Sequence, residues 1–171
     1  MPEPHVIIAL TNPKSPSNVG AVMRAAGCFG ADEVRYSGVR YERAAKFQTD
    51  TKQVAKTIPL IGMDDLLAEL PEDTKVVCVE LVEGACPLPK FEHPKRAIYV
   101  FGPEDGNLSQ AVVSASDAVV YMPTQGCLNL AASVNVLLYD RVAKEGGRQE
   151  TGDALIRASR DTRNHLRVSE G

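Results

Sequence analysis

The segment from Arg96 to Asp140 contains two short apolar stretches, and each is followed by a loop that holds both glycine and proline. The stretches Arg96–Phe101 and Asp117–Met122 have the length and composition of buried parallel strands. The loops Gly102–Gly106 and Pro123–Asn129 let the backbone approach a ligand closely, because glycine has no side chain. Open α/β sheets bind their ligands beyond the carboxyl ends of strands. We therefore expect the functional site to be built from these two loops.

Strands and helices are expected to alternate along the rest of the chain. Strands are predicted from short apolar runs, and helices from apolar residues at helical spacing that follow helix-starting residues. The predicted strands are His5–Leu10, Glu33–Tyr36, Ile58–Ile61 and Lys75–Leu81, and the predicted helices run from about Ser15 to Gly30, Asp64 to Pro71 and Asn129 to Lys144. This alternation predicts an α/β fold with a single, mostly parallel sheet and helices on both faces.

Two polar segments lie outside this pattern. Residues 37–51 show no clear periodicity, so we expect a mobile loop of a length that is often functional, followed by a helical turn at 52–57. Residues 148–171 carry arginines at spacings that align them on one face of a helix with few apolar residues. These are Arg157, Arg160, Arg163 and Arg167. We divide the chain into one domain, residues 1–147, and a helical or partly flexible extension, residues 148–171.

The composition is that of a single globular domain. The chain has 171 residues, of which 44% are hydrophobic and 24% charged. Its four cysteines show no CxxC pair and no zinc-like spacing, so we expect reduced core cysteines, no metal site and a cytosolic protein. The amino terminus lacks the basic start of a signal peptide, and no apolar stretch reaches the ~20 residues of a membrane span. We therefore expect a cytoplasmic protein without membrane contacts.

The charged residues are unevenly distributed. Residues 1–60 hold 8 basic and 5 acidic residues, whereas residues 61–110 hold 4 basic and 10 acidic residues. The net charge of −3 gives no general argument for nucleic-acid binding, but a polyanion should meet the first third of the chain or its tail. An ordinary solvated surface is the simpler explanation of the same distribution.

The motifs of several common enzyme classes are absent. The sequence has no GxGxxG, no GxxxxGK[ST] and no GxSxG, and its three histidines are scattered. Covalent or histidine-based hydrolysis is therefore poorly supported. Glu104 in the first loop and Asn129 before the last helix suit a site that orients a cofactor with reactivity of its own. Each also has a simpler explanation, Glu104 as a charge in the first turn of a helix and Asn129 as a helix cap.

Three blocks of sequence together resemble the SpoU/TrmH family of the SPOUT superfamily, which are RNA ribose 2′-O-methyltransferases that use S-adenosylmethionine. The segment Asn18–Arg24 resembles the family's N-x-G-x-x-x-R helix start. Phe101–Gly106 is similar to its F-G-x-E-x-x-G loop, and Met122–Leu130 is similar to its I-P…S-L-N stretch. The blocks occur in the family's order, and the resemblance covers about residues 5–145.

The resemblance implies a fold, a cofactor and an assembly. The carboxyl-terminal part of the parallel sheet would be threaded into a deep trefoil knot, and two copies would form a homodimer. S-adenosylmethionine would lie among three loops and would be bound largely through backbone groups. The residues predicted to bind it are Glu80, Leu81, Gly102, Pro103, Glu104, Gly106, Met122, Leu128 and Leu130. RNA would meet the cofactor near the subunit interface.

The resemblance also implies the catalytic residues Arg24, Asn18, Glu104 and Asn129. Family proposals make the matching arginine a base. Because arginine stays protonated in proteins, we prefer a charged Arg24 that grips an RNA phosphate and stabilises the developing alkoxide. Asn18 and Glu104 would orient Arg24, and Asn129 would shape the cofactor or ribose pocket. A surface arginine on an amphipathic helix is the simpler alternative for Arg24.

The chain departs from the family pattern at two positions. Cys127 stands where the family usually has serine, and Ala131 stands where a second serine is common. A hydroxyl group is therefore missing, which puts the fine geometry of the site in question more than the reaction class.

The resemblance implies that RNA is held by the catalytic domain itself, because we expect no added amino-terminal RNA-binding domain. The predicted contacts are Arg40, Arg43, Lys46 and Lys52, with the arginines of the tail as a further candidate. Such phosphate contacts position RNA without reading its sequence. The compact size favours tRNA over rRNA. A non-catalytic RNA-binding relative and an unrelated α/β enzyme of small-molecule metabolism are the other interpretations.

Overall fold

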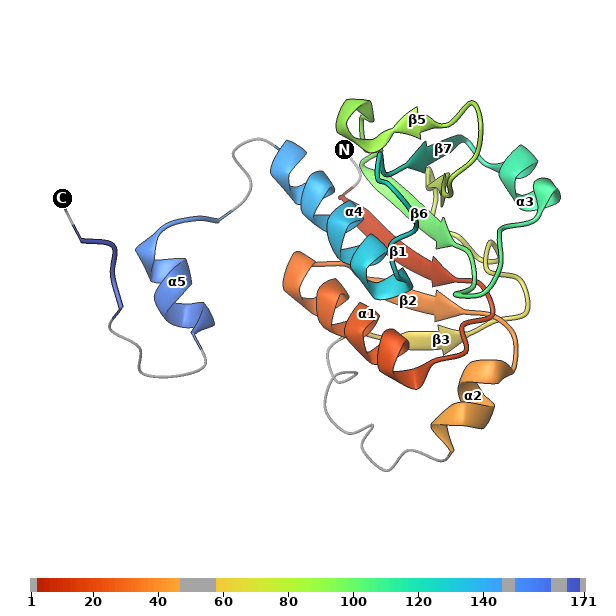
Figure 1. Cartoon of the computed structure of the whole chain (residues 1–171), viewed down its shortest axis with the longest axis horizontal. Helices are drawn as coiled ribbons and strands as arrows, with labels where there is room; N and C mark the ends of the chain where they lie inside the picture. Colours follow the sequence, from red (N-terminus) through yellow and green to blue (C-terminus); the bar gives the residue numbers. More distant parts are fainter. Residues whose placement is uncertain (1–2, 47–57, 146–149, 161–165, 170–171) are drawn as a thin grey trace.

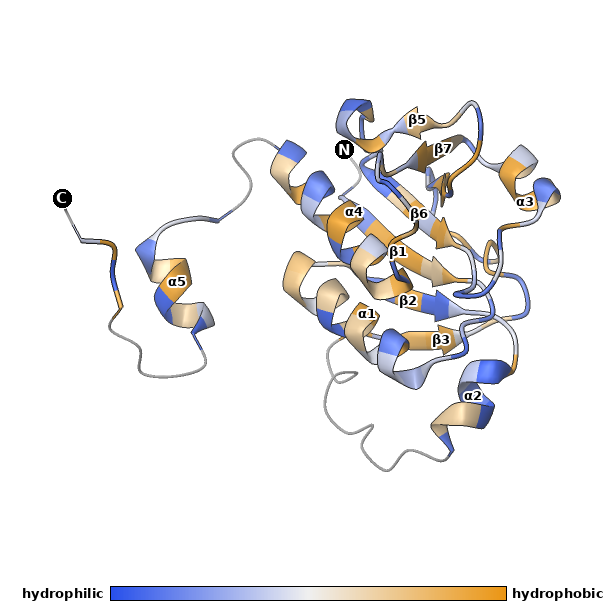
Figure 2. Ribbon diagram, in the orientation of Figure 1, coloured by the Kyte–Doolittle hydropathy of each residue, from blue (hydrophilic) through white to orange (hydrophobic). Residues whose placement is uncertain are grey.

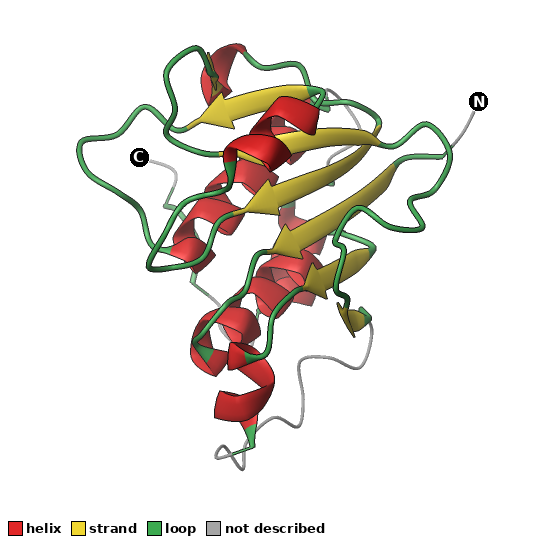
Figure 3. Cartoon of the chain, turned by 90° about the vertical axis from the view of Figure 1, so that its right-hand side faces the viewer, coloured by secondary structure: helices red, strands yellow, loops and turns green. Residues whose placement is uncertain are grey.

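The computed structural model describes residues 3–46, 58–145, 150–160 and 166–169 (Figure 1). Seven parallel strands form one sheet in the order β3-β2-β1-β6-β4-β7-β5, and the strand arrows point the same way in Figure 3. The strands are β1 (His5–Leu10), β2 (Glu33–Tyr36), β3 (Leu60–Gly62), β4 (Lys75–Val79), β5 (Cys86–Pro87), β6 (Arg96–Phe101) and β7 (Ala118–Tyr121), and the helices are α1 (Pro16–Phe29), α2 (Arg40–Ala45), α3 (Gln110–Ala115), α4 (Leu130–Lys144) and α5 (Asp153–Ser159). The predicted α/β fold is confirmed, as are the bounds predicted for β1, β2 and β6.

The side chains of the central strands point alternately into two separate cores. Ile8 and Leu10 of β1 pack with residues of α1 and α4, whereas Ile7 and Ala9 pack on the opposite face. α1 and α4 lie side by side across the first face, and the short α3 lies over the second (Figure 1 and Figure 3). Figure 2 shows hydrophobic residues concentrated in the central strands. Both faces are thus covered, which explains the continuous apolar runs of β1 and β6.

The two long helices begin as the sequence predicts. The side chain of Ser15 caps α1 by accepting a hydrogen bond from the N–H of Asn18 at 3.2 Å, and Gly30 ends the helix with a φ of 74°. The side chain of Asn129 caps α4 by accepting a hydrogen bond from the N–H of Ala132 at 2.8 Å. These caps fix the first turn of each helix beside the carboxyl ends of the strands.

The predicted helix over Asp64–Pro71 is wrong, and the segment forms a series of turns. Arg35 of β2 is 4% exposed, and its guanidinium donates hydrogen bonds to three carbonyl groups of this segment. These belong to Leu66 (3.0 Å), Ala68 (2.7 Å) and Glu69 (3.3 Å). Glu69 also has a positive φ of 52°, which no α-helix contains. A contact from β2 therefore fixes the turns, which still place Leu66 in the second core.

The loop expected over residues 37–51 is also partly wrong, because residues 40–45 form α2. Six residues are too few to show a helical period in the sequence. The rest of that loop and the predicted turn at 52–57 lie outside the described residues. β3 begins two residues later than predicted, and β4 ends at Val79 rather than Leu81.

All four cysteines are free, as expected, but only Cys78 is buried in the core. Cys28 and Cys127 are exposed, and Cys86 is half-buried. The predicted core position is therefore wrong for Cys28 and Cys127.

The tail holds one helix among its described residues. α5 has no buried residue, and it carries Arg157, with Arg160 directly after its end. Arg163 lies outside the described residues. No helix of the described part of the chain is both long and apolar enough to cross a membrane.

Buried polar residues at the amino-terminal edge of the sheet join α4 to the segment before β6. In His93, Nδ1 lies 2.7 Å from the hydroxyl of Tyr99, and Nε2 lies 2.7 Å from the carboxylate of Asp140. Arg141 donates a hydrogen bond to the Tyr99 hydroxyl at 2.8 Å. Burial lowers the pKa of His93 and outweighs the hydrogen bond to Asp140, which raises it. The neutral ring, donating to Asp140 and accepting from Tyr99, fits both contacts.

Because His93 is held neutral in the fold, we expect the free energy of unfolding to fall as the pH drops below about 6.5, the pKa of histidine in an unfolded chain. The contribution is complete above that pKa and is lost as the pH falls through the lower pKa of the folded chain. Urea unfolding of wild type and His93→Gln from about pH 8 to about pH 5 checks this. The variant should be roughly 1–3 kcal/mol less stable at the higher pH, and its stability should depend less on pH. Equal pH dependence in both proteins would contradict the prediction.

Candidate functional site

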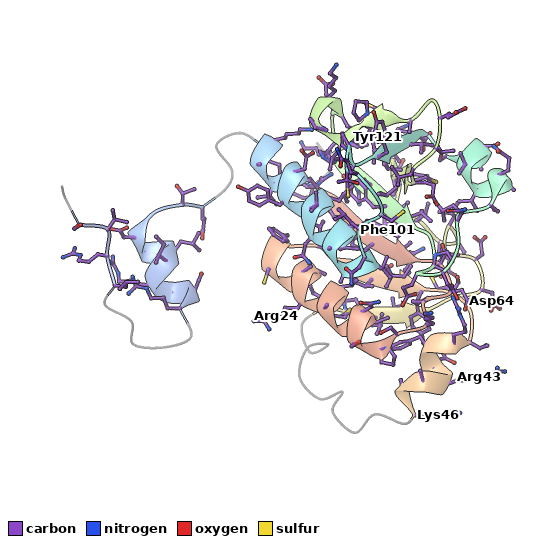
Figure 4. All side chains as sticks on the ribbon, viewed as in Figure 1. Arg24, Arg43, Lys46, Asp64, Phe101 and Tyr121 are labelled. Atoms are coloured by element: carbon purple, nitrogen blue, oxygen red, sulfur yellow. The ribbon has the colours of Figure 1, made fainter. Side chains whose placement is uncertain are left out.

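Three loops at the carboxyl ends of β4, β6 and β7 surround a cavity of about 280 Å³. Phe101 and Tyr121, the last residues of β6 and β7, form part of its wall (Figure 4). Every residue predicted to bind the cofactor lines this cavity, together with three of the four predicted catalytic residues. These lining residues are Asn18, Glu80, Leu81, Gly102, Pro103, Glu104, Gly106, Met122, Leu128, Asn129 and Leu130. The structure thus brings them together at the predicted edge of the sheet.

Gly102 and Glu80 hold the loop after β6 against the end of β4. The carboxylate of Glu80 accepts hydrogen bonds from the N–H of Leu108 and from the N–H of Leu81, each at 3.0 Å. A Cβ atom at residue 102 would lie 3.3 Å from the backbone nitrogen of Leu108 and 3.4 Å from the Glu80 carboxylate. Glycine therefore allows this close approach, and Glu80 acts on the shape of the cavity through its backbone contacts.

The carboxylate of Glu104 binds the segment that leads into α1. It accepts hydrogen bonds from the backbone N–H of Lys14 and of Ser15, each at 3.0 Å, and from the side-chain amide of Asn18 at 3.2 Å. Burial raises the pKa of Glu104, but the hydrogen bonds outweigh burial and lower the pKa overall. Glu104 is therefore ionised at neutral pH and places a negative charge in the cavity wall.

Asn18 connects Glu104 to Asn129. Its side-chain oxygen accepts a hydrogen bond from the side-chain amide of Asn129 at 3.4 Å, and its own amide donates to Glu104. The Asn129 side chain thus caps α4 and contacts Asn18 at the same time. Three predicted catalytic residues form one polar chain across the starts of α1 and α4.

Arg24 lies apart from this chain. It is exposed on α1, it does not line the cavity, and in Figure 4 its side chain extends away from the sheet. No hydrogen bond or ion pair joins it to another residue of the described parts of the chain. Within the single chain Asn18 and Glu104 contact each other and not Arg24, so their orientation of Arg24 stays a prediction.

The predicted RNA-binding residues differ in their surroundings. Arg43 and Lys46 on and just after α2 are exposed and point outward (Figure 4). Arg40 has its guanidinium bound to Asp105 in the loop after β6. Lys52 lies outside the described residues.

Sequence reasoning missed several residues of the cavity wall. The hydroxyl-bearing residues Thr124 and Ser133 line the cavity, together with Cys127. Thr124 donates a hydrogen bond to the carbonyl of Gly126 at 2.9 Å and so holds the second loop in its turn. Ser133, one turn into α4, supplies a second hydroxyl to the cavity wall, which Cys127 also lines. Its spacing of four residues from Asn129 was the available signal.

The described residues contain no group of three or more histidine, cysteine, aspartate or glutamate side chains that could hold a metal ion. The chemistry of the cavity wall comes from backbone groups, apolar side chains, three amides, two carboxylates, three hydroxyl groups and one thiol.

Several known proteins are similar to this chain. A 23S rRNA (guanosine-2′-O-)-methyltransferase RlmB from Nitrosomonas europaea is 27% identical over 163 residues, which is 90% of this chain and 61% of that protein. The SpoU methyltransferase AviRb from Streptomyces viridochromogenes, solved with AdoMet, has a TM-score of 0.66 and 22% identity over 84% of this chain and 58% of its own. A structure concerned with 2-OH methylation of C/U34 on tRNA has a TM-score of 0.68 and 21% identity over 84% of this chain and 92% of its own.

The two structural similarities confirm the fold. The chain spans about 60% of the length of the RlmB relative. The model of the SpoU rRNA Methylase family matches residues 5–139, a range that contains all three loops of the cavity. The chain therefore belongs to the SpoU rRNA methylase family.

Proposed function

We propose that this chain binds S-adenosylmethionine in the three-loop cavity and transfers its methyl group to a ribose 2′-hydroxyl of RNA. The observation that carries the proposal is the convergence of the cofactor residues expected from the family on one cavity of about 280 Å³. The AdoMet-bound AviRb structure, which shares the fold, adds support.

The residues of the cavity fit this cofactor chemically. S-adenosylmethionine has a flat adenine ring, a hydroxyl-bearing sugar and positive charges on its sulfonium and amino groups. The exposed Leu81 and Leu128 offer apolar surface for a ring, and glycine loops offer backbone groups for polar atoms. The ionised Glu104 supplies a negative charge in the wall.

When bound, the sulfonium supplies an activated methyl group, so the protein needs no nucleophile of its own. The task left to the chain is to hold the ribose oxygen in line with that methyl and to help the oxygen lose its proton. Hydrogen bonds from Asn18 to Glu104 and from Asn129 to Asn18 fix the part of the cavity wall that these side chains form. Arg24 would bind an RNA phosphate and stabilise negative charge on the ribose oxygen.

Because Arg24 lies outside the cavity of its own chain, we place its action at the interface of a homodimer. The exposed apolar residues Val136 (42%) and Tyr139 (59%) of α4, with Phe29 of α1, support a second copy on this side. They line a largely apolar groove that continues to Leu128 at the cavity. Light scattering on the purified chain should give the mass of a dimer, and a monomer at micromolar concentration would contradict this assembly.

We also infer a trefoil knot. β7 lies in the sheet between β4 and β5, although residues 80–85 connect those two strands. Lys144, the last residue of α4, also donates hydrogen bonds to the carbonyl groups of Leu88 (2.5 Å) and Phe91 (2.9 Å), which follow β5. Threading of residues 117–145 through the loop of residues 80–95 accounts for the position of β7 and for the hydrogen bonds of Lys144. An experimental structure whose trace passes outside that loop would contradict the knot.

For the substrate we propose tRNA, with rRNA as the second candidate. The structure concerned with tRNA methylation matches this chain over 92% of its own length, so the two are of similar size. The RlmB relative is named for 23S rRNA but is a longer protein. Arg43, Lys46 and Lys52, with the arginines of residues 148–171, would contact phosphates. With this substrate we also propose a cytoplasmic location.

Incubation with labelled S-adenosylmethionine tests the function. The RNA comes from a strain that lacks the protein, and the tRNA and rRNA fractions are assayed separately. We expect label on one ribose of a tRNA. Label confined to rRNA would overturn only the choice of substrate, whereas no label in either fraction, with the cofactor bound, would favour a non-catalytic RNA-binding relative.

A further inference from the structure

Arg40 joins three segments of the chain, one of which, the loop after β6, lines the cavity. Its guanidinium donates two hydrogen bonds to the carboxylate of Asp105, at 2.8 and 3.0 Å, and a third to the backbone carbonyl of Asn12 at 2.6 Å. Asn12 follows β1, Arg40 begins α2, and Asp105 lies in the loop after β6. A single side chain therefore connects the amino-terminal part of the domain to the loop that contains Gly102 and Gly106.

The position of Arg40 is itself fixed. The N–H of Asn12 donates to the hydroxyl of Ser37 at 3.1 Å, and Asn12 has a positive φ of 42°. Gly38, at a φ of 78°, packs so closely that a Cβ there would lie 2.1 Å from the Asn12 side-chain oxygen. Two residues later the chain enters α2 with Arg40. The turn at Ser37–Gly38 thus sets the direction from which Arg40 reaches Asp105.

Glu104 and Asp105 hold the same loop from two sides. Glu104 binds the segment before α1 through Lys14 and Ser15, and Asp105 binds the start of α2 through Arg40. The hydrogen bond from Arg40 lowers the pKa of Asp105, so the pair is charged at neutral pH. A loop with two glycines has many conformations, and ordering it on binding would cost affinity unless other contacts hold it first.

We propose that Arg40 is a positioning residue that keeps the loop after β6 in its cofactor-binding conformation and joins it to α2. The inference rests on the proposed function and replaces the RNA contact predicted for Arg40 from the sequence. Exposed ion pairs usually contribute little. This one is bidentate and includes a backbone carbonyl, which makes it stronger and more directional. The contact restrains the loop after β6, which lines the cavity.

The arrangement also couples two ligands. Arg43 is exposed on the same helix as Arg40, and Lys46 directly follows it. RNA bound at these residues would hold α2 in place, and α2 would hold the cofactor loop through Arg40 and Asp105. Cofactor and RNA should therefore each raise the affinity for the other, by the same factor.

Calorimetric titration with S-adenosylmethionine in the absence of RNA tests the proposal. We expect Asp105→Asn and Arg40→Ala each to weaken cofactor binding by about 10-fold, with a melting temperature close to that of wild type. The double variant should bind no more weakly than Arg40→Ala alone, because Asp105 acts through its contact with Arg40. Asp64→Asn makes the same chemical change at an exposed site at the same edge of the sheet (Figure 4) and should bind like wild type.

Arg43→Ala separates positioning from RNA contact. It should leave cofactor affinity in the absence of RNA unchanged and weaken RNA binding, whereas Arg40→Ala should weaken cofactor binding without RNA present. Wild-type cofactor affinity in both Arg40→Ala and Asp105→Asn would overturn the proposal. So would losses that add in the double variant. If the wild type binds no cofactor at all, the proposed function fails, which is a distinct result.

Discussion

Replacing Arg24 with lysine is expected to lower the rate of methyl transfer by about 100-fold or more while leaving the affinity for S-adenosylmethionine unchanged. Arg24 lies outside the cavity, so the cofactor does not need it for binding. Its planar fork can bind a phosphate and a ribose oxygen together, whereas an ammonium group is a single point charge and cannot replace that geometry. The loss should therefore appear in the turnover rate at saturating cofactor. Single-turnover assays with labelled cofactor and tRNA, beside a calorimetric titration, measure both quantities.

Arg96→Lys is the matched control for Arg24→Lys. Arg96 begins β6 at the opposite edge of the sheet, and it has no place in the proposed site. Its substitution should leave the turnover rate within about twofold of wild type. Near-full turnover in Arg24→Lys would remove the role assigned to Arg24, and loss of cofactor binding in that variant would indicate a structural role instead.

Glu104→Gln is expected to weaken cofactor binding by about 30-fold, which corresponds to about 2 kcal/mol. Both carboxylate oxygens of Glu104 accept hydrogen bonds, one from Lys14 and the other from Ser15 and Asn18. A glutamine has only one side-chain oxygen, so in either orientation its NH₂ group would face an N–H donor. The loop after β6 would then separate from the start of α1, and the negative charge in the cavity wall would be lost.

Calorimetry on Glu104→Gln and on Glu83→Gln measures this effect. Glu83 is an exposed carboxylate in the turn after β4, and it makes no hydrogen bond with the described residues. Its substitution should leave cofactor affinity unchanged. If Glu104→Gln binds the cofactor as wild type does, the three hydrogen bonds of Glu104 have no part in shaping the cavity.

The sequence predicts most of the elements near the site, because the signals for them are local. Short apolar runs correctly locate β1, β2 and β6. Cap residues correctly locate the starts of α1 and α4. The loops of the cavity follow from these elements, since parallel strands place their carboxyl ends at the same edge.

Contacts between residues distant in the sequence account for several differences between the predictions and the structure. Leucine spacing after Asp64 favours a helix, but the guanidinium of Arg35 binds three carbonyls there and fixes turns. The sequence around Arg40 likewise gives no sign of its hydrogen bonds to Asp105, which lies 65 residues away. Cys28 and Cys127 lie beside apolar runs yet are exposed, because a position beside a run does not determine which face it occupies.

The place of Arg24 depends on a different kind of contact. The family motif identifies the residue and implies that Asn18 and Glu104 orient it, but it does not say whether the three residues meet within one chain. In the single chain, Asn18 and Glu104 contact each other and Arg24 faces outward. A contact with another molecule cannot be deduced from the spacing of residues in one sequence.

Hydrogen–deuterium exchange with and without S-adenosylmethionine tests the central claim most directly, because it locates the bound cofactor on the chain. The account predicts binding of one cofactor per chain and slower exchange in the three loops, residues 79–81, 101–107 and 121–130, which line the cavity. Absence of binding would contradict it. Protection confined to residues 90–95 at the opposite edge of the sheet, where a second cavity lies, would contradict it equally.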